Sequence, residues 1–310
     1  MVVVETVQEA APETEKKWDF ASDKTFKKRL IRKGKGLFCP RDGSVCQFLI
    51  TPLPPTSAET LTSRSLRLGH TLEGLKEIII GEHDAELDHM LDKIIEHMKA
   101  EEVAEFKFNI NAVEHTSLNT EVGSKAKESV LIAIRIELLS FVEVPELWEL
   151  NSAQLVDGGR HHKEEGVKWF KNGNHVYALR RFMKAIRFLI VVDKEILENL
   201  AKENEEAAEL LKEYRFLMAN VYVNISAVQL KSNNYNAVID NCGRALALEP
   251  SNVKAFYRRG LAHASLGNSS SAKADFLSAL KLSPNDKDIR KELEKYGIGS
   301  KEPLKEMKTE

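Results

Sequence analysis

The 310-residue sequence has few cysteines, no long apolar run and no excess of charge of either sign. Its three cysteines, Cys39, Cys46 and Cys242, are scattered and odd in number, so they predict no disulfide framework and fit a reducing compartment. The apolar run at 188–192 is far shorter than the roughly 18–20 residues that cross a bilayer. The formal net charge of -2 gives no overall attraction to nucleic acid or to an acidic membrane, and we expect neither as a partner.

Targeting and cofactor motifs are also scarce. The opening "MVVVETVQEAAPETE" has only three consecutive valines before its acids, which is not the pattern of a signal peptide. We expect a cytoplasmic protein, with the nucleus as an alternative because cations are dense at 24–35. An exposed edge strand protected by lysines is the other interpretation of that stretch. We interpret His161 and His162, beside Glu164 and Glu165, as helix surface, so we expect no metal and no cofactor.

The first half of the sequence has the pattern of short strands. Runs rich in β-branched and aromatic residues are separated by Gly, Pro and Asp, and several of them alternate between apolar and polar residues. Residues 86–98 keep apolar side chains at helical spacing. Strands that fold onto one helix predict an α+β domain with an antiparallel sheet. The expected strands are 25–36, 44–50, 65–68, 103–110 and 129–142.

From about residue 150 the pattern becomes helical. Pro250 and Pro284 are 34 residues apart, which is the period of the tetratricopeptide repeat, a helix pair that stacks into an all-α solenoid. Three units fill the motif's small, large and proline positions, and Cys242 stands where a large residue is usual. The motif residues are Gly166, Trp169, Ala178, Phe182 and Ala185, then Ser226, Val238, Ala245 and Pro250, then Gly260, Ala272, Phe276, Ala279 and Pro284.

The spacing between the first two units is longer by 26 residues. Those residues are charged and helix-forming, so we expect them to lengthen two adjoining helices. Residues 285–296 have the pattern of the capping helix that solenoids need. The expected organisation is a tail at 1–20, the α+β domain at 21–144, a linker or helix start at 145–158, the repeats with their cap at 159–297 and a tail at 298–310.

Tetratricopeptide stacks expose a concave groove lined by the first helix of each unit. With the units in register, four polar residues are expected to point into it: Lys163, Asn224, Lys254 and Arg258. Lys254 and Arg258 are four residues apart on one helical face, where like charges repel by a few tenths of a kcal/mol unless something neutralises them. Because Lys, Arg and Asn all donate hydrogen bonds to carboxylates, we expect the groove to bind the acidic end of another protein.

The same four residues resemble the dicarboxylate clamp of tetratricopeptide co-chaperones. That clamp binds the Glu-Glu-Val-Asp terminus of the 90-kDa and 70-kDa heat-shock chaperones. Four of its five positions match, and the fifth, usually Asn, is Val167 here. Loss of that donor weakens binding by ~1 kcal/mol. The resemblance implies the 90-kDa chaperone as partner, with the 70-kDa chaperone as an alternative because both end alike.

The first half resembles an FKBP-type immunophilin domain. "TFKKRLIRKGKGLFCPRDGSVCQFLI" has that domain's opening pattern of a basic strand, Gly-x-Gly, Pro-x-Asp-Gly and an apolar strand. "HMKAEEVAEFKF" is similar to its passage from helix to strand, and "VLIAIRIELLSF" to its final strand. An FKBP domain followed by three repeats is the layout of the large immunophilins. Within them, the chain looks most like members whose first domain is eroded.

Active FKBP domains isomerise prolyl bonds inside an aromatic pocket. Residues 21–144 contain no Tyr and no Trp, and Ile50 and Leu91 align with a Tyr and a Trp of that pocket. We therefore expect no isomerase activity. The predicted function is that of a co-chaperone adaptor, which holds the chaperone by its repeats while the first domain contacts an unidentified client. A chaperone-independent scaffold and a weak prolyl isomerase are the alternatives.

Overall fold

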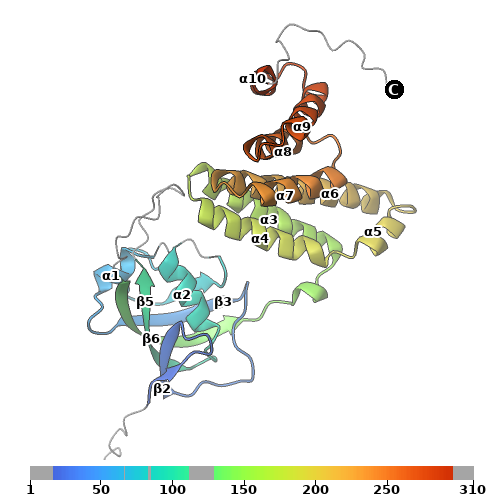
Figure 1. Cartoon of the computed structure of the whole chain (residues 1–310). Helices are drawn as coiled ribbons and strands as arrows, with labels where there is room; N and C mark the ends of the chain where they lie inside the picture. The colour runs from blue at the N-terminus through green and yellow to red at the C-terminus, as the bar shows by residue number, and fades with distance from the viewer. Residues whose placement is uncertain (1–16, 66, 83–84, 112–128, 296–310) are drawn as a thin grey trace, which may run out of the picture. The chain divides into compact units, whose positions relative to one another are not determined.

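The computed structural model describes residues 17–65, 67–82, 85–111 and 129–295 (Figure 1). These residues divide into two compact units, which meet in the sequence between Val144 and Pro145. An antiparallel sheet with a helix precedes a set of helical repeats, so the predicted fold class is confirmed. The expected tails, apart from 17–20, lie outside the described residues. None of the described helices is long and apolar enough to span a membrane.

The first unit contains a six-stranded sheet in the order β1-β2-β5-β6-β3-β4, with every pairing antiparallel. The register of the two central strands pairs Phe106 with Ile134 on the core face. Lys107 lies on the opposite face, because successive side chains of a strand alternate. The strands are β1 (Asp19–Phe20), β2 (Phe26–Arg32), β3 (Val45–Pro52), β4 (Lys76–Ile79), β5 (Val103–Asn111) and β6 (Ser129–Val142).

Helix α2 (Glu86–Ile95) closes the core of this unit. Its side chains Leu87, Leu91 and Ile94 are buried at helical spacing and belong to one hydrophobic cluster with the inward side chains of the strands. A short helix, α1 (Ala58–Thr62), begins at the N-cap Ser57, whose side chain accepts a hydrogen bond from a backbone N–H of the first turn.

The expected strand at 65–68 was wrong. Its described residues lie in an irregular loop, and a strand that the sequence pattern did not predict, β4, forms further on. Side chains hold this loop in place: Arg67 Nη1 donates to Asp92 Oδ1 of α2 at 2.8 Å, and Leu68 is buried in the core. The apolar residues of this stretch therefore belong to a loop. Its side chains pack on the core, and the backbone of its described residues forms no strand ladder.

The second unit is built from consecutive helices that pack in pairs: α3 with α4, α6 with α7 and α8 with α9 (Figure 1). The first helices of neighbouring pairs also contact each other, α3 against α6 and α6 against α8. The helices are η1 (Leu147–Glu149), α3 (Ser152–Lys171), α4 (His175–Val191), α5 (Lys194–Leu200), α6 (Glu205–Lys231), α7 (Tyr235–Leu248), α8 (Val253–Ser265), α9 (Ser269–Leu282) and α10 (Lys287–Glu294).

Glycines let the helices of a pair approach closely. A Cβ atom on Gly166 of α3 would lie 2.5 Å from the Phe182 ring of α4, and one on Gly260 of α8 would lie 2.7 Å from the Phe276 ring of α9. Both distances are well inside van der Waals contact. At these motif positions a small residue of the first helix therefore accommodates a large residue of the second.

The insert between the first two repeats forms a helix of its own. Asp193 begins α5 by accepting a hydrogen bond from the backbone of Ile196, and Asn204 caps the start of α6 in the same way. Helix α6 has 27 residues, and α4 has 17, against 14 in each of α7 and α9. Both adjoining helices are therefore lengthened as expected, α4 only slightly, and the rest of the insert forms α5 between two new N-caps.

Candidate functional site

The four predicted clamp residues, Lys163, Asn224, Lys254 and Arg258, all lie on the first helices of the pairs. Lys163 is on α3, Asn224 is on α6, and the other two are on α8. An asparagine side chain caps the start of each of these helices, which fixes where the first turn begins. Because α6 contacts both α3 and α8, the three segments that carry the clamp residues are neighbours in the stack.

Arg258 is a half-buried cation that meets no carboxylate among the described residues. Its Nη1 donates a hydrogen bond to the backbone carbonyl of Val223 on α6. Burial lowers the pKa of its guanidinium, because removal from water disfavours the charged form. A carboxylate that binds to this partly buried cation would stabilise its charged form.

The other clamp residues are also available to a ligand. Lys254 is exposed, and Lys163 and Asn224 are half-buried. Within the part of the chain that the structure describes, none of the three side chains makes a hydrogen bond or an ion pair. Together with Arg258, these side chains offer three positive charges and one amide.

The neighbouring Arg259 has a different role. Its Nε and Nη2 donate to the two carboxylate oxygens of Asp275 on α9, at 2.9 and 2.7 Å. The hydrogen bonds that Arg259 donates to Asp275 raise the pKa of Arg259. Sequence analysis did not predict this ion pair, although an acid on the second helix of the same repeat was a usable indication. The pair joins the two helices, so Arg259 is part of the framework.

Val167, at the fifth clamp position, is half-buried and packs against the hydrophobic core of the first two helix pairs. It supplies apolar contact where an asparagine would offer a donor.

In the first unit, Ile50 of β3 and Leu91 of α2 are 5% and 1% exposed and share one core cluster. Both are packing residues in this structure.

Four of the seven cations at 24–35 form ion pairs with glutamates, which sequence analysis did not predict. Partners come from β5, from the turn before it and from β6, so cross-strand pairing accounts for much of the charge. Glu105 is 2% exposed and lies between Arg29 and Arg135. The ion pairs are Lys28–Glu102, Arg29–Glu105, Arg32–Glu137 and Lys35–Glu101.

The histidine pair on α3 is not simply helix surface, which corrects the sequence interpretation. His161 is exposed, but His162 is buried, and its ring centroid lies 5.2 Å from that of Phe188 on α4. Successive residues of a helix point in different directions, so one of the two meets the partner helix. We assign His162 a packing role.

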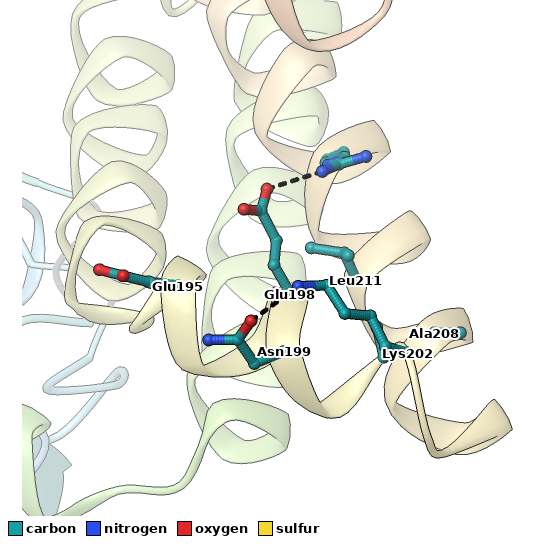
Figure 2. Close-up of a pocket in the computed structure, with 8 residues that line it drawn as sticks. Glu195, Glu198, Asn199, Lys202, Ala208 and Leu211 are labelled. Atoms are coloured by element: carbon teal, nitrogen blue, oxygen red, sulfur yellow. Dashed lines mark hydrogen bonds and ion pairs between the residues drawn. The ribbon is translucent and has the colours of Figure 1, made fainter.

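A hollow of about 670 Å³ lies on the insert, between α5 and the first turns of α6 (Figure 2). Arg215 Nη2 donates to Glu198 at 2.7 Å, and this bond lowers the pKa of the Glu198 carboxyl. Lys202 donates to Asn199 at 2.9 Å. With Glu195 as the second acid, the charges of the lining residues cancel. The hollow therefore offers no excess charge to a ligand.

Comparison with known proteins finds similarity in both halves of the chain. A tetratricopeptide repeat model matches residues 253–286. Human peptidyl-prolyl cis-trans isomerase FKBP4 is 26% identical over 272 residues, which cover 86% of this chain and 53% of that protein. Human FK506-binding protein-like is 26% identical over 285 residues, covering 91% of this chain and 68% of that protein. The chain spans about half the length of the first of these relatives.

A solved structure shares the fold. The crystal structure of residues 1–211 of CG17282 aligns with a TM-score of 0.51 at 18% identity, and the match covers 71% of this chain and 96% of that one. The sequence relatives extend the likeness over most of the chain, across both the sheet domain and the helical repeats. By sequence, the chain is therefore similar over 86–91% of its length to the FKBP-type relatives, and residues 253–286 match the tetratricopeptide repeat.

Proposed function

We propose that this chain is a non-catalytic co-chaperone adaptor whose repeats bind the acidic carboxyl terminus of the 90-kDa heat-shock chaperone. The observation that carries the proposal is Arg258, a half-buried guanidinium with a backbone carbonyl but no carboxylate as partner among the described residues. Lys163, Asn224 and Lys254 lack polar partners in the same part of the chain. Their match to the co-chaperone clamp supports the choice of ligand.

The chemistry of a terminal aspartate fits this set of donors. Its main-chain and side-chain carboxylates provide two acceptors on one residue, and charge-assisted hydrogen bonds to such groups are about twice as strong as neutral ones. Three cations around two carboxylates also make the interaction dependent on salt. The 70-kDa chaperone ends in the same residues and is the alternative partner.

The first unit is proposed to hold a client protein without isomerising it. Ile50 and Leu91 stand where the family's pocket has aromatic residues, and both are buried in the core of the unit. A chaperone tail bound by the repeats would then raise the local concentration of client and chaperone. In a prolyl-peptide assay the full chain is expected to give the uncatalysed rate, whereas an acceleration above it would restore the weak-isomerase alternative.

The test of the leading proposal is calorimetric titration of the full chain with a peptide ending in Glu-Glu-Val-Asp. The wild type is compared with Lys254→Ala/Arg258→Ala. The control is Lys273→Ala/Lys281→Ala, which removes two exposed cations from α9, the second helix of the same pair. Both variants change the net charge equally, so only position distinguishes them. The same peptide with an amidated carboxyl terminus tests the need for the terminal carboxylate.

The expected result is binding near the micromolar range, about -8 kcal/mol, that is lost in the clamp variant and retained in the control. Affinity should fall as salt rises. Absence of binding by the folded wild type would favour the second candidate, a scaffold that takes a different acidic peptide. Val167 is the observation behind that candidate, because it replaces the fifth donor of the clamp by an apolar contact.

A further inference from the structure

The three helix pairs differ at one pair of core positions. In α3/α4 and in α8/α9, a glycine of the first helix lies against a phenylalanine of the second. The equivalent residues of α6/α7 are Ser226 and Cys242, both fully buried. Cysteine is much smaller than phenylalanine, so the middle pair has no aromatic ring at the position where the other two pairs have one.

The side chain of Arg258 reaches α6 next to this small pair. The Val223 carbonyl accepts both from Arg258 Nη1 and, at 2.6 Å, from the Ser226 hydroxyl. Burial raises the pKa of the Cys242 thiol, while hydrogen bonding to Ser226 and the charge of Arg258 act against that rise. Ser226, the partner of Cys242 in this pair of positions, thus shares its hydrogen-bond acceptor with Arg258.

The first repeat shows the opposite combination of sizes. Its core position is filled by Phe182. Arg258 lies two residues before Gly260 on α8, and the equivalent residue on α6, two before Ser226, is Asn224. In the described part of the chain Asn224 makes no hydrogen bond to α3. A large core residue thus accompanies a short polar residue, and a small core residue accompanies a long cation.

We propose that Cys242 is a positioning residue for Arg258. Its small side chain leaves the space in which the guanidinium is held toward the Val223 carbonyl, and this fixes the direction from which Arg258 meets a carboxylate. The inference rests on the proposed function, because it says what orients one member of the clamp. Guanidinium–carboxylate recognition depends on planar geometry. A side chain that is already ordered also loses less rotamer freedom when the ligand binds.

The test variant restores the combination found in the other repeats. Cys242→Phe alone would press a ring against the Cβ of Ser226, because a Cβ at the matching glycines would lie 2.5 and 2.7 Å from their rings. Ser226→Gly/Cys242→Phe avoids that clash. Cys242→Ala is the control, since it keeps the space open. Each full-length variant is checked by thermal unfolding and titrated with the Glu-Glu-Val-Asp peptide, with and without Arg258→Ala.

Ser226→Gly/Cys242→Phe is expected to weaken binding about tenfold, and Cys242→Ala to change it less than about twofold. Adding Arg258→Ala to the double variant should produce little further loss, because both changes act through one side chain. A folded double variant with wild-type affinity would overturn the inference, and so would a loss that adds fully to that of Arg258→Ala. If the double variant does not fold, Cys242→Leu, of intermediate size, takes its place with the same expectations.

A readout without peptide separates this inference from the proposed function. The Arg258 Nε–H resonance of the ¹⁵N-labelled chain should exchange slowly with water in the wild type and in Cys242→Ala. In Ser226→Gly/Cys242→Phe it should exchange like that of an exposed arginine. Equal exchange in the three proteins would refute the positioning role of Cys242, whether or not any peptide binds. Slow exchange that is lost in the double variant, with no peptide binding by the wild type, would refute the chaperone-tail ligand and leave the positioning role standing.

Discussion

Arg259 and Asp275 form a two-point ion pair between α8 and α9, while Arg258, the preceding residue, meets only a carbonyl of α6 among the described residues. Adjacent residues of a helix point about 100° apart, so one arginine faces the partner helix and the other faces the neighbouring repeat. Asp275 is buried, and its charge depends on Arg259 for compensation. Two chemically identical side chains therefore differ in role: Arg259 joins two helices, and Arg258 belongs to the proposed binding site.

The two arginines should respond oppositely to substitution. Arg259→Ala leaves the Asp275 carboxylate buried without its cation and should lower the free energy of unfolding by about 2–3 kcal/mol. Arg258→Ala removes a half-buried charge with no carboxylate partner in the described structure, so it should change that free energy by less than about 1 kcal/mol. Urea unfolding of the two variants measures the difference. Equal losses of stability would contradict the division of roles.

Glycine substitutions test the close approach of the helices. Gly166→Ala places a Cβ 2.5 Å from the Phe182 ring and should destabilise the chain by about 1–3 kcal/mol through overpacking. Gly243→Ala, within α7, has nothing within 4 Å of the new Cβ and should stabilise it by about 0.5–1 kcal/mol through helix propensity. Thermal unfolding distinguishes the two signs. A neutral Gly166→Ala would mean that α4 can move away from α3.

The Arg29–Glu105–Arg135 group should make the first unit sensitive to acid. Burial alone would raise the pKa of Glu105, but hydrogen bonds from Arg135 and Arg29 lower it below its ordinary value of 4.5. A lowered native pKa contributes stability that is present above pH 4.5 and is lost as the pH falls through the native pKa. Glu105→Gln should flatten this part of the stability curve. The free energy of unfolding is measured in urea between pH 5 and pH 3. If it depends on pH equally in the wild type and in Glu105→Gln, Glu105 makes no such contribution.

Much of the fold could be predicted from the sequence because its periods are regular. The alternation in β5 and β6 and the 34-residue spacing of Pro250 and Pro284 each report a repeated packing environment. The loop around Leu68 could not be recognised, because its apolar residues pack on the core while Arg67 makes a side-chain ion pair with α2. Side-chain anchoring of a loop leaves no period in the sequence.

The candidate site was predictable in part for the same reason. Repeat register places Lys163, Asn224, Lys254 and Arg258 on first helices, as the structure does. Register gives no information on what an arginine already contacts, so the difference between Arg258 and Arg259 required coordinates. The density of cations at 24–35 suggested the nuclear alternative for a similar reason, since their glutamate partners are distant in the sequence.

Val167→Asn should strengthen the proposed peptide interaction. The substitution returns an amide donor to the fifth clamp position, and one added hydrogen bond to a carboxylate is worth about 1 kcal/mol, or roughly a fivefold gain in affinity. Val167 packs against the core of the first two pairs, so the variant should also lose about 1 kcal/mol of stability. Calorimetry with the Glu-Glu-Val-Asp peptide and thermal unfolding measure the two effects. Val167→Ala, which shortens the side chain without adding a donor, is the control and should lose stability without gaining affinity. If both variants bind equally, position 167 does not reach the ligand, and the clamp would consist of the other four residues alone.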